Sequence, residues 1–213
     1  MSADIAALTG GFDDAVTRAQ EVFRAVMEAL ARPGTLQKLD AQELTAQDMQ
    51  PPAPLTPELA AIALTLADHE TPLWLDAKLA GSETVEQWLR FHTGARIVAD
   101  PMQAAFALIA DPLAMPPLSD FAAGEEDYPD RSTTLLLAVE QLTVADAANA
   151  QALHLQGPGI RGQASLAIAP LPAAFPGWLA ENRLLFPRGW DCVFAGHGHI
   201  AAIPRSTMLA GRG

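Results

Sequence analysis

The run Leu135-Leu136-Leu137, inside the apolar segment 133–139, constrains the fold most strongly. A strand with one wet face alternates apolar and polar side chains, and three successive leucines break that alternation. Such a run is typical of a strand that is covered on both faces, which requires a layer above and a layer below the sheet. Because helical patterns occupy both ends of a strand-rich middle, we predict a layered α/β fold.

Four segments carry helical patterns, and their boundaries show ordinary start and stop signals. Pro33-Gly34 ends the first helix, since proline cannot continue the hydrogen-bond ladder and glycine accepts the turn. Thr56 suits the N-cap of the second helix. Thr84 and Gln87 have the spacing of a capping box in the third. The predicted helices are 12–32, 57–68, 83–92 and 173–185.

Short apolar segments predict the strands, and proline-rich stretches at 41–57 and 111–131 predict surface connections. Segment 104–110 fits either a strand or a helix, and we favour a strand. The last two strands form a hairpin around Gly196-His197-Gly198. The predicted strands are 35–39, 73–75, 95–99, 104–110, 133–139, 153–155, 164–169, 190–195 and 200–203.

Composition bounds the function classes. The 213 residues predict one domain, 1–213, at roughly 100–200 residues per domain. A net charge of −12 disfavours binding to nucleic acid and to anionic membranes. No apolar run reaches the roughly 18 residues of a membrane span, and the start lacks a signal-peptide pattern. The single cysteine, Cys192, cannot form an internal disulfide, so we expect a cytoplasmic protein.

His69, with Glu70, is the candidate for acid–base chemistry. Its acidic neighbours, Asp68 and Glu70, would raise the pKa of the imidazole toward neutral. The alternative is a surface histidine at a helix C-terminus, where the helix dipole favours it. The same alternative applies to His92. We assign no residue as catalytic and keep His69 and Glu70 as candidates.

Metal and phosphate motifs give weaker signals. His197 and His199 would share one face of a strand, but a zinc site needs three or four ligands, and we expect no metal. The segment Gly157–Gly162 could cradle an anion with backbone amides, or could simply form a tight turn. The familiar phosphate-loop, dinucleotide and nucleophile motifs are absent from the sequence.

Arginines at proline-containing turns are the candidates for anion binding. The chain has eleven arginines and only two lysines, and four of the arginines stand beside a fixed backbone. A guanidinium held in place matches carboxylate or phosphate groups. The alternative is a structural role in which each arginine pairs with a carboxylate of this chain. The four candidates are Arg32, Arg131, Arg188 and Arg205.

An ordered set of short blocks resembles the PhnH family, one of the components of the carbon–phosphorus lyase system. The blocks span nearly the whole chain, and their order is more specific than any one of them. They are Gly11-Phe12, Phe23-Arg24 through Ala31-Arg32-Pro33-Gly34, Leu66 through Thr71, Phe91-His92-Thr93-Gly94, Ala105-Phe106-Ala107, Tyr128 through Thr134, Gly157-Pro158-Gly159-Ile160, Phe186 through Asp191 and Ile203 through Thr207.

The resemblance implies a role in organic phosphonate catabolism. In that system a multi-subunit complex, ribose 1-methylphosphonate 5-triphosphate synthase, transfers alkylphosphonate to the ribose of a nucleoside triphosphate with loss of adenine. The resemblance implies partner subunits G, I, J and L, a homodimer when isolated, and a non-catalytic assembly role. It also implies a three-layer α/β/α sandwich around a mixed sheet, like the large domain of the pyridoxal-phosphate transferases without their cofactor.

The residues themselves limit cofactor chemistry. A pyridoxal enzyme needs a Schiff-base lysine, and neither Lys38 nor Lys78 stands in a convincing place. One cysteine cannot hold an iron–sulfur cluster. We therefore expect no cofactor. Two alternatives remain: a self-sufficient enzyme that binds phosphorylated small molecules, and a relative of pyridoxal enzymes that still binds pyridoxal phosphate.

Overall fold

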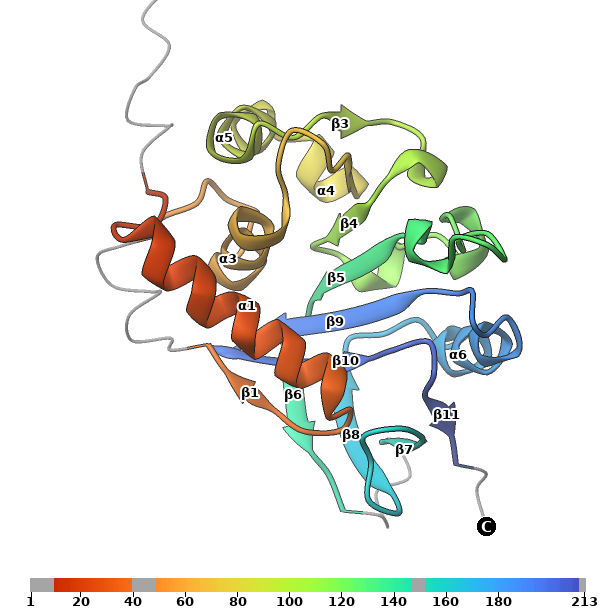
Figure 1. The fold of residues 1–213 in the computed structure, drawn as a ribbon. Helices are drawn as coiled ribbons and strands as arrows, with labels where there is room; N and C mark the ends of the chain where they lie inside the picture. Colours follow the sequence, from red (N-terminus) through yellow and green to blue (C-terminus); the bar gives the residue numbers. More distant parts are fainter. Residues whose placement is uncertain (1–9, 40–48, 147–151, 211–213) are drawn as a thin grey trace, which may run out of the picture.

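A seven-stranded mixed sheet forms the centre of the computed structural model, which describes residues 10–39, 49–146 and 152–210 (Figure 1). The strand order is β1-β10-β9-β5-β4-β2-β3. Strands β9 to β3 in that order are parallel, whereas β10 and β1 each run antiparallel to their neighbour. The bounds are β1 Gln37–Lys38, β2 Leu73–Leu75, β3 Ile97–Val98, β4 Phe106–Ile109, β5 Thr134–Ala138, β9 Asp191–Gly196 and β10 His199–Ile203.

Helices cover one face of this sheet. Leu136 of β5 and Val193 of β9 point into that core, where Val26 of α1 and Leu59 of α3 also lie. Thr56 caps α3 by accepting a hydrogen bond from the Leu59 amide, as its sequence signal predicts. The helices are α1 Ala15–Ala31, α3 Pro57–Leu66, α4 Ala77–Ala80 and α5 Glu83–Thr93.

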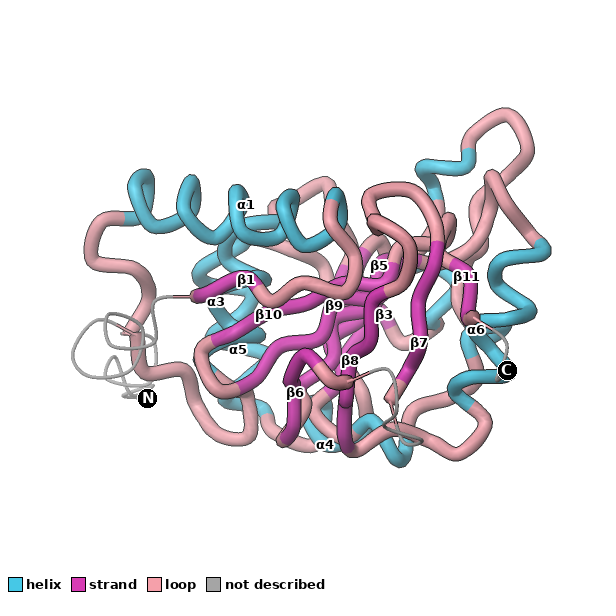
Figure 2. The backbone as a smooth tube through the Cα atoms, turned by 90° about the horizontal axis from the view of Figure 1, so that it is seen from below, coloured by secondary structure: helices cyan, strands magenta, loops and turns pink. Residues whose placement is uncertain are grey.

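A second, antiparallel sheet covers much of the other face. Its strand order is β11-β7-β8-β6, and helix α6 packs into the same core. Figure 2 shows α1 on one side of β1 and β10, with β6 and β8 on the other. Leu135 and Leu137 point into this second core. The bounds are β6 Gln141–Val144, β7 Leu153–Gln156, β8 Ala164–Ala169, β11 Met208–Leu209 and α6 Phe175–Leu184.

The layered α/β fold with a mixed sheet is therefore confirmed. Leu135, Leu136 and Leu137 are all fully buried and alternate between the two cores, as a doubly covered strand requires. The strict α/β/α sandwich is not confirmed, because one outer layer is mainly a sheet. The segments 153–155 and 164–169 pair with each other in that layer and do not join the central sheet.

Two details of the local predictions are wrong. The N-cap of α5 is Ser82 and not Thr84, and its hydroxyl pairs with that of Thr84 at 2.9 Å. Gln87 bonds to the side chain of Glu83, so no capping box forms. Strands β6 and β11 and helix α4 were not predicted. Part of the predicted 41–57 connection, residues 41–48, lies outside the described residues.

Candidate functional site

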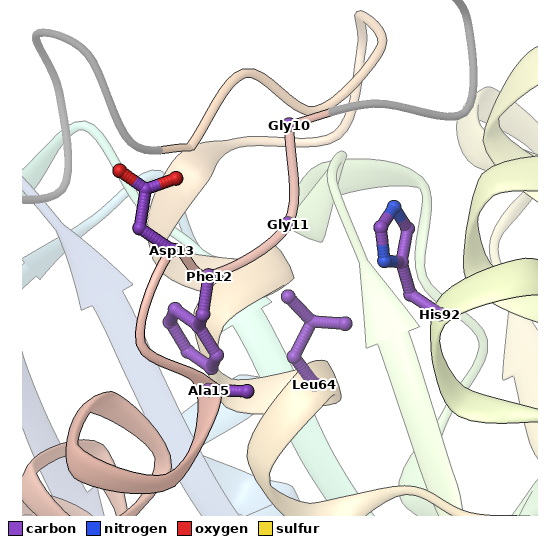
Figure 3. Close-up of a pocket in the computed structure, with 7 residues that line it drawn as sticks. All are labelled: Gly10, Gly11, Phe12, Asp13, Ala15, Leu64 and His92. Atoms are coloured by element: carbon purple, nitrogen blue, oxygen red, sulfur yellow. The ribbon is translucent and has the colours of Figure 1, made fainter. Parts of the chain in front are cut away.

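A cavity of about 330 Å³ opens where α1 begins, between that helix start, α3 and α5 (Figure 3). Backbone from the segment before α1 forms one wall, and single side chains from α3 and α5 form the others. It has both polar and apolar walls, which suits a small ligand with an apolar body. The residues that line it are Gly10, Gly11, Phe12, Asp13, Ala15, Leu64 and His92.

The imidazole of His92 is the polar group with the most fixed position in this cavity. Its ring packs on Trp88 with 4.4 Å between ring centroids, and it meets the edge of Phe91 at 5.0 Å. A Cβ atom at Gly11 would lie 2.7 Å from Cε1 and 2.8 Å from Nδ1 of the imidazole. Only glycine therefore allows the backbone to approach this ring so closely.

Acidic residues at the start of α1 make the cavity a poor anion site. Asp14 caps the helix by accepting a hydrogen bond from the Thr17 amide at 3.1 Å. Bonds from Thr17 lower the pKa of the Asp14 carboxyl below its ordinary value. In Figure 3 the Asp13 carboxylate points away from His92, so the two do not form an acid–base pair. The start of a helix by itself attracts anions, but the carboxylates of Asp13 and Asp14 repel a phosphate here and favour a neutral or cationic ligand.

His69 and Glu70 lie elsewhere, on the turn between α3 and β2. Their side chains are 80% and 81% exposed, and the closest nitrogen and oxygen are 3.9 Å apart. The Asp68 carboxylate accepts hydrogen bonds from the Glu70 amide and from Thr71, which lower its pKa. Asp68 therefore stabilises the turn, and the candidate pair faces solvent outside the cavity.

Arg205 is held by groups of this chain. Its Nε donates to both carboxylate oxygens of Asp191 at 3.2 Å, and its Nη1 and Nη2 donate to the Pro129 carbonyl and the Ser132 hydroxyl at 2.6 Å. The Arg205 and Asp191 side chains are 15% and 19% exposed. These bonds join the ends of β9 and β10 to the turn before β5. Structural pairing, the alternative considered for the arginines, describes what Arg205 does here.

The side chains of Arg32 and Arg131 are more accessible than that of Arg205. The guanidinium carbon of Arg131 lies 4.0 Å from the centroid of the Tyr128 ring. Arg188 lies in the turn before β9, near the turn that carries Arg131, because the Gly189 amide donates to the Ala123 carbonyl at 2.8 Å. Arg32 lies apart at the end of α1 and pairs with Glu28 at 3.3 Å. The structure thus brings Arg131, Arg188 and Arg205 to one end of the central sheet, where β5 and β9 begin.

Asp76 bridges the place where such a sheet usually binds its ligand. In open α/β sheets, ligands bind at the carboxyl ends of two neighbouring strands whose connections leave in opposite directions. Here those strands are β2 and β4, since β2 leads to β3 on one side and β4 leads to β5 on the other. Asp76 follows β2 and accepts hydrogen bonds from the Ala110 and Asp111 amides at 2.8 Å.

The remaining predicted groups have structural partners. Lys78 donates its ammonium to the Ala110 carbonyl at 3.2 Å. The imidazoles of His197 and His199 lie within hydrogen-bonding distance of backbone carbonyls, 2.6 Å from Glu140 and 2.9 Å from His197. Burial raises the pKa of the Cys192 thiol, in accord with a small buried apolar residue. Within the described ranges no three His, Cys, Asp or Glu side chains gather as metal ligands require.

These features define a class: a layered α/β protein in which Asp76 bridges the carboxyl ends of β2 and β4. Of the helices in the described part, none has the length and apolar character of a membrane span. The family model described as bacterial phosphonate metabolism protein (PhnH) matches residues 10–210. The chain belongs to this PhnH family.

A curated relative agrees with the family assignment. The chain is 39% identical over 209 residues to the alpha-D-ribose 1-methylphosphonate 5-triphosphate synthase subunit PhnH of Rhizobium meliloti (strain 1021). The alignment covers 98% of each chain. The resemblance predicted from the ordered blocks is therefore confirmed.

Sequence reasoning did not find the cavity as a site. It noted Gly11-Phe12 and the block around His92 separately, as parts of the resemblance. Both belong to the blocks on which the resemblance rested, but their proximity depends on how α1 packs against α3 and α5. The sequence offered one signal for this site, which is Gly11 next to Phe12 just before a helix.

Proposed function

We propose that this chain is a non-catalytic assembly subunit of a ribose 1-methylphosphonate 5-triphosphate synthase, in the transferase class of enzymes. In this proposal the complex transfers alkylphosphonate to the ribose of a nucleoside triphosphate with loss of adenine. The relative's name and near-complete alignment support the assignment to this complex. The buried Asp76 supports the non-catalytic role, because its carboxylate is committed to backbone amides at the place where such sheets usually bind ligands.

The proposal also covers the partner subunits and the cellular compartment. The chain folds as one domain, 1–213, in the cytoplasm and joins subunits G, I, J and L of the carbon–phosphorus lyase system. When isolated it forms a homodimer. Arg131 and Arg188 contribute anion contacts at a subunit boundary, and His69 and Glu70 remain the acid–base candidates if this chain takes part in catalysis.

Reconstitution tests the assembly role. The purified chain is added to the other synthase subunits, and the mixture is analysed by size exclusion with mass spectrometry of each fraction. We expect the chain to co-elute with them and to restore ribosyl product formation. Elution of the chain by itself at every subunit ratio contradicts the proposal.

A second candidate is a self-sufficient enzyme that binds phosphorylated small molecules, and the exposed guanidinium of Arg131 is the group that favours it. Calorimetry separates the two. We expect no heat of binding when a nucleoside triphosphate or an alkylphosphonate is titrated into the isolated chain, and no turnover. Turnover by the isolated chain that is lost in His92→Ala or His69→Ala would establish the second candidate instead.

A further inference from the structure

One exposed surface combines aromatic rings, guanidinium groups and an unprotected leucine. Leu184, at the end of α6, is 85% exposed, and Phe186 and Tyr128 are 51% and 49% exposed. We define the aromatic–arginine surface by six residues from the turn before β5, the end of α6 and the turn before β9. They are Tyr128, Arg131, Arg183, Leu184, Phe186 and Arg188.

The two turns lie side by side because hydrogen bonds join them at their bases. The Gly189 amide donates to the Ala123 carbonyl at 2.8 Å, and the indole nitrogen of Trp190 donates to the Phe121 carbonyl at 3.1 Å. Asn182 closes the second turn by bonding to both the amide and the carbonyl of Trp190 at 2.8 Å. Both turns are therefore held in place where β5 and β9 begin.

The rings of this surface are held before any partner arrives. Arg183 places its guanidinium carbon 5.0 Å from the Phe186 centroid, and Arg131 covers Tyr128 at 4.0 Å. Two backbone hydrogen bonds, one in each direction between Glu125 and Tyr128, fix the turn that carries the Tyr128 ring. Ordered aromatic and arginine side chains lose little entropy on binding and dominate protein–protein binding energy.

Charge indicates what kind of chain covers the surface. Glu126, Asp127 and Asp130 are exposed on the same turn as Tyr128, and within the described residues none of the three forms an ion pair. They disfavour a phosphate-rich ligand and a second copy, because each copy carries the same turn and a net charge of −12. They favour a partner with basic residues.

We infer that the aromatic–arginine surface docks a different protein chain that presents apolar side chains beside lysines or arginines. This inference rests on the proposed assembly role and assigns a surface to it. The exposed side of α1, with Val16, Phe23 and Met27, is less suitable. Polar Gln20 interrupts it, and Arg32 of that helix already pairs with Glu28.

Binding measurements with surface variants test the inference. The full-length chain is titrated into the remaining synthase subunits of the same organism, expressed together without it. We expect Leu184→Ser with Phe186→Ser to raise the dissociation constant at least tenfold. The control Leu113→Ser with Val144→Ser, which changes two other exposed apolar residues elsewhere, should change it less than twofold. Circular dichroism checks that both variants fold.

Charge reversal tests the second half of the inference. Glu126→Lys with Asp127→Lys should weaken binding at least fivefold and reduce its salt dependence, whereas Glu140→Lys, at the β5–β6 turn, should not. Failure of the unchanged chain to join the other subunits contradicts the assembly role itself. If the unchanged chain joins and the serine variant binds within twofold, the surface assignment is wrong. Light scattering that shows a homodimer dissociated by the serine variant would also overturn it, by making a second copy the occupant.

Discussion

Gly11 shows how a missing side chain creates a candidate site. Its backbone lies against the imidazole of His92, and that contact fills the place of a Cβ atom. The histidine is in turn held by Trp88 and Phe91. Sequence could indicate each of these residues as part of a family block, but the contact between distant segments depends on helix packing, which local patterns do not encode.

Gly11→Ala should disturb this contact. The new methyl group would lie under 3 Å from two ring atoms, so the imidazole or the helix start must move. We expect a loss of about 1–2 kcal/mol in the free energy of unfolding, typical of an overpacked site. Urea unfolding measures the loss, and NMR spectra of the His92 ring report its displacement.

Gly177→Ala is the matched control. A Cβ at Gly177 meets no atom within 4 Å, and the residue lies inside helix α6. Alanine there should raise stability by about 0.5–1 kcal/mol, because it restricts the unfolded chain. Equal effects of the two substitutions would show that the contact with His92 has no energetic importance.

Helix α1 illustrates what periodicity can and cannot predict. The apolar spacing predicted a helix over 12–32, and the helix spans Ala15–Ala31, with Asp14 as its cap. Strand β6 was missed because Gln141–Val144 is short and its pairing partner β8 lies beyond a long connection. Strand pairing across such distances is set by tertiary packing, so the second sheet could not be assigned from local pattern.

The cap of α1 should respond to acid. Bonds from Thr17 lower the pKa of Asp14, so its carboxylate stabilises the folded helix start. That contribution is present above the ordinary value of about 3.8 and is lost as the pH falls through the lower, folded-state value. We expect hydrogen exchange at Thr17 and Arg18, corrected for the intrinsic rate, to accelerate over this acidic range.

Asp14→Ala should give the accelerated exchange already at neutral pH and remove its acid dependence. Asp13→Ala serves as the control, because it leaves the Asp14 cap in place. An unchanged exchange rate at Thr17 in Asp14→Ala would show that the cap does not hold this helix start.

At the scale of the molecule, Asp76 joins the two halves of the parallel sheet. Its carboxylate is buried, at 5% exposure for the residue, and accepts amides from α4 and from the turn after β4. Layered order and most strands were predictable from apolar runs and turn signals. The link that Asp76 makes to the turn after β4 was not predictable, because a single aspartate before a short helix resembles an ordinary N-cap.

Asp76→Ala should destabilise the whole fold. Three backbone amides, of Leu79, Ala110 and Asp111, would lose their acceptor, at a cost of about 1 kcal/mol or more each. We expect a loss of about 3 kcal/mol by urea unfolding. Asp100→Ala, which removes an exposed cap from Met102, should cost less than about 1 kcal/mol. Similar losses in the two variants would contradict a joining role for Asp76.

The two outermost strands of the central sheet, β1 and β3, are only two residues long. Edge strands this short offer few unpaired amides and carbonyls, which protects a protein against uncontrolled polymerisation through strand addition. A neighbouring chain cannot extend this sheet by more than a residue or two at either border. Recognition at these two borders must then depend on the shape and chemistry of side chains, which fixes the orientation of a partner more narrowly than backbone pairing would.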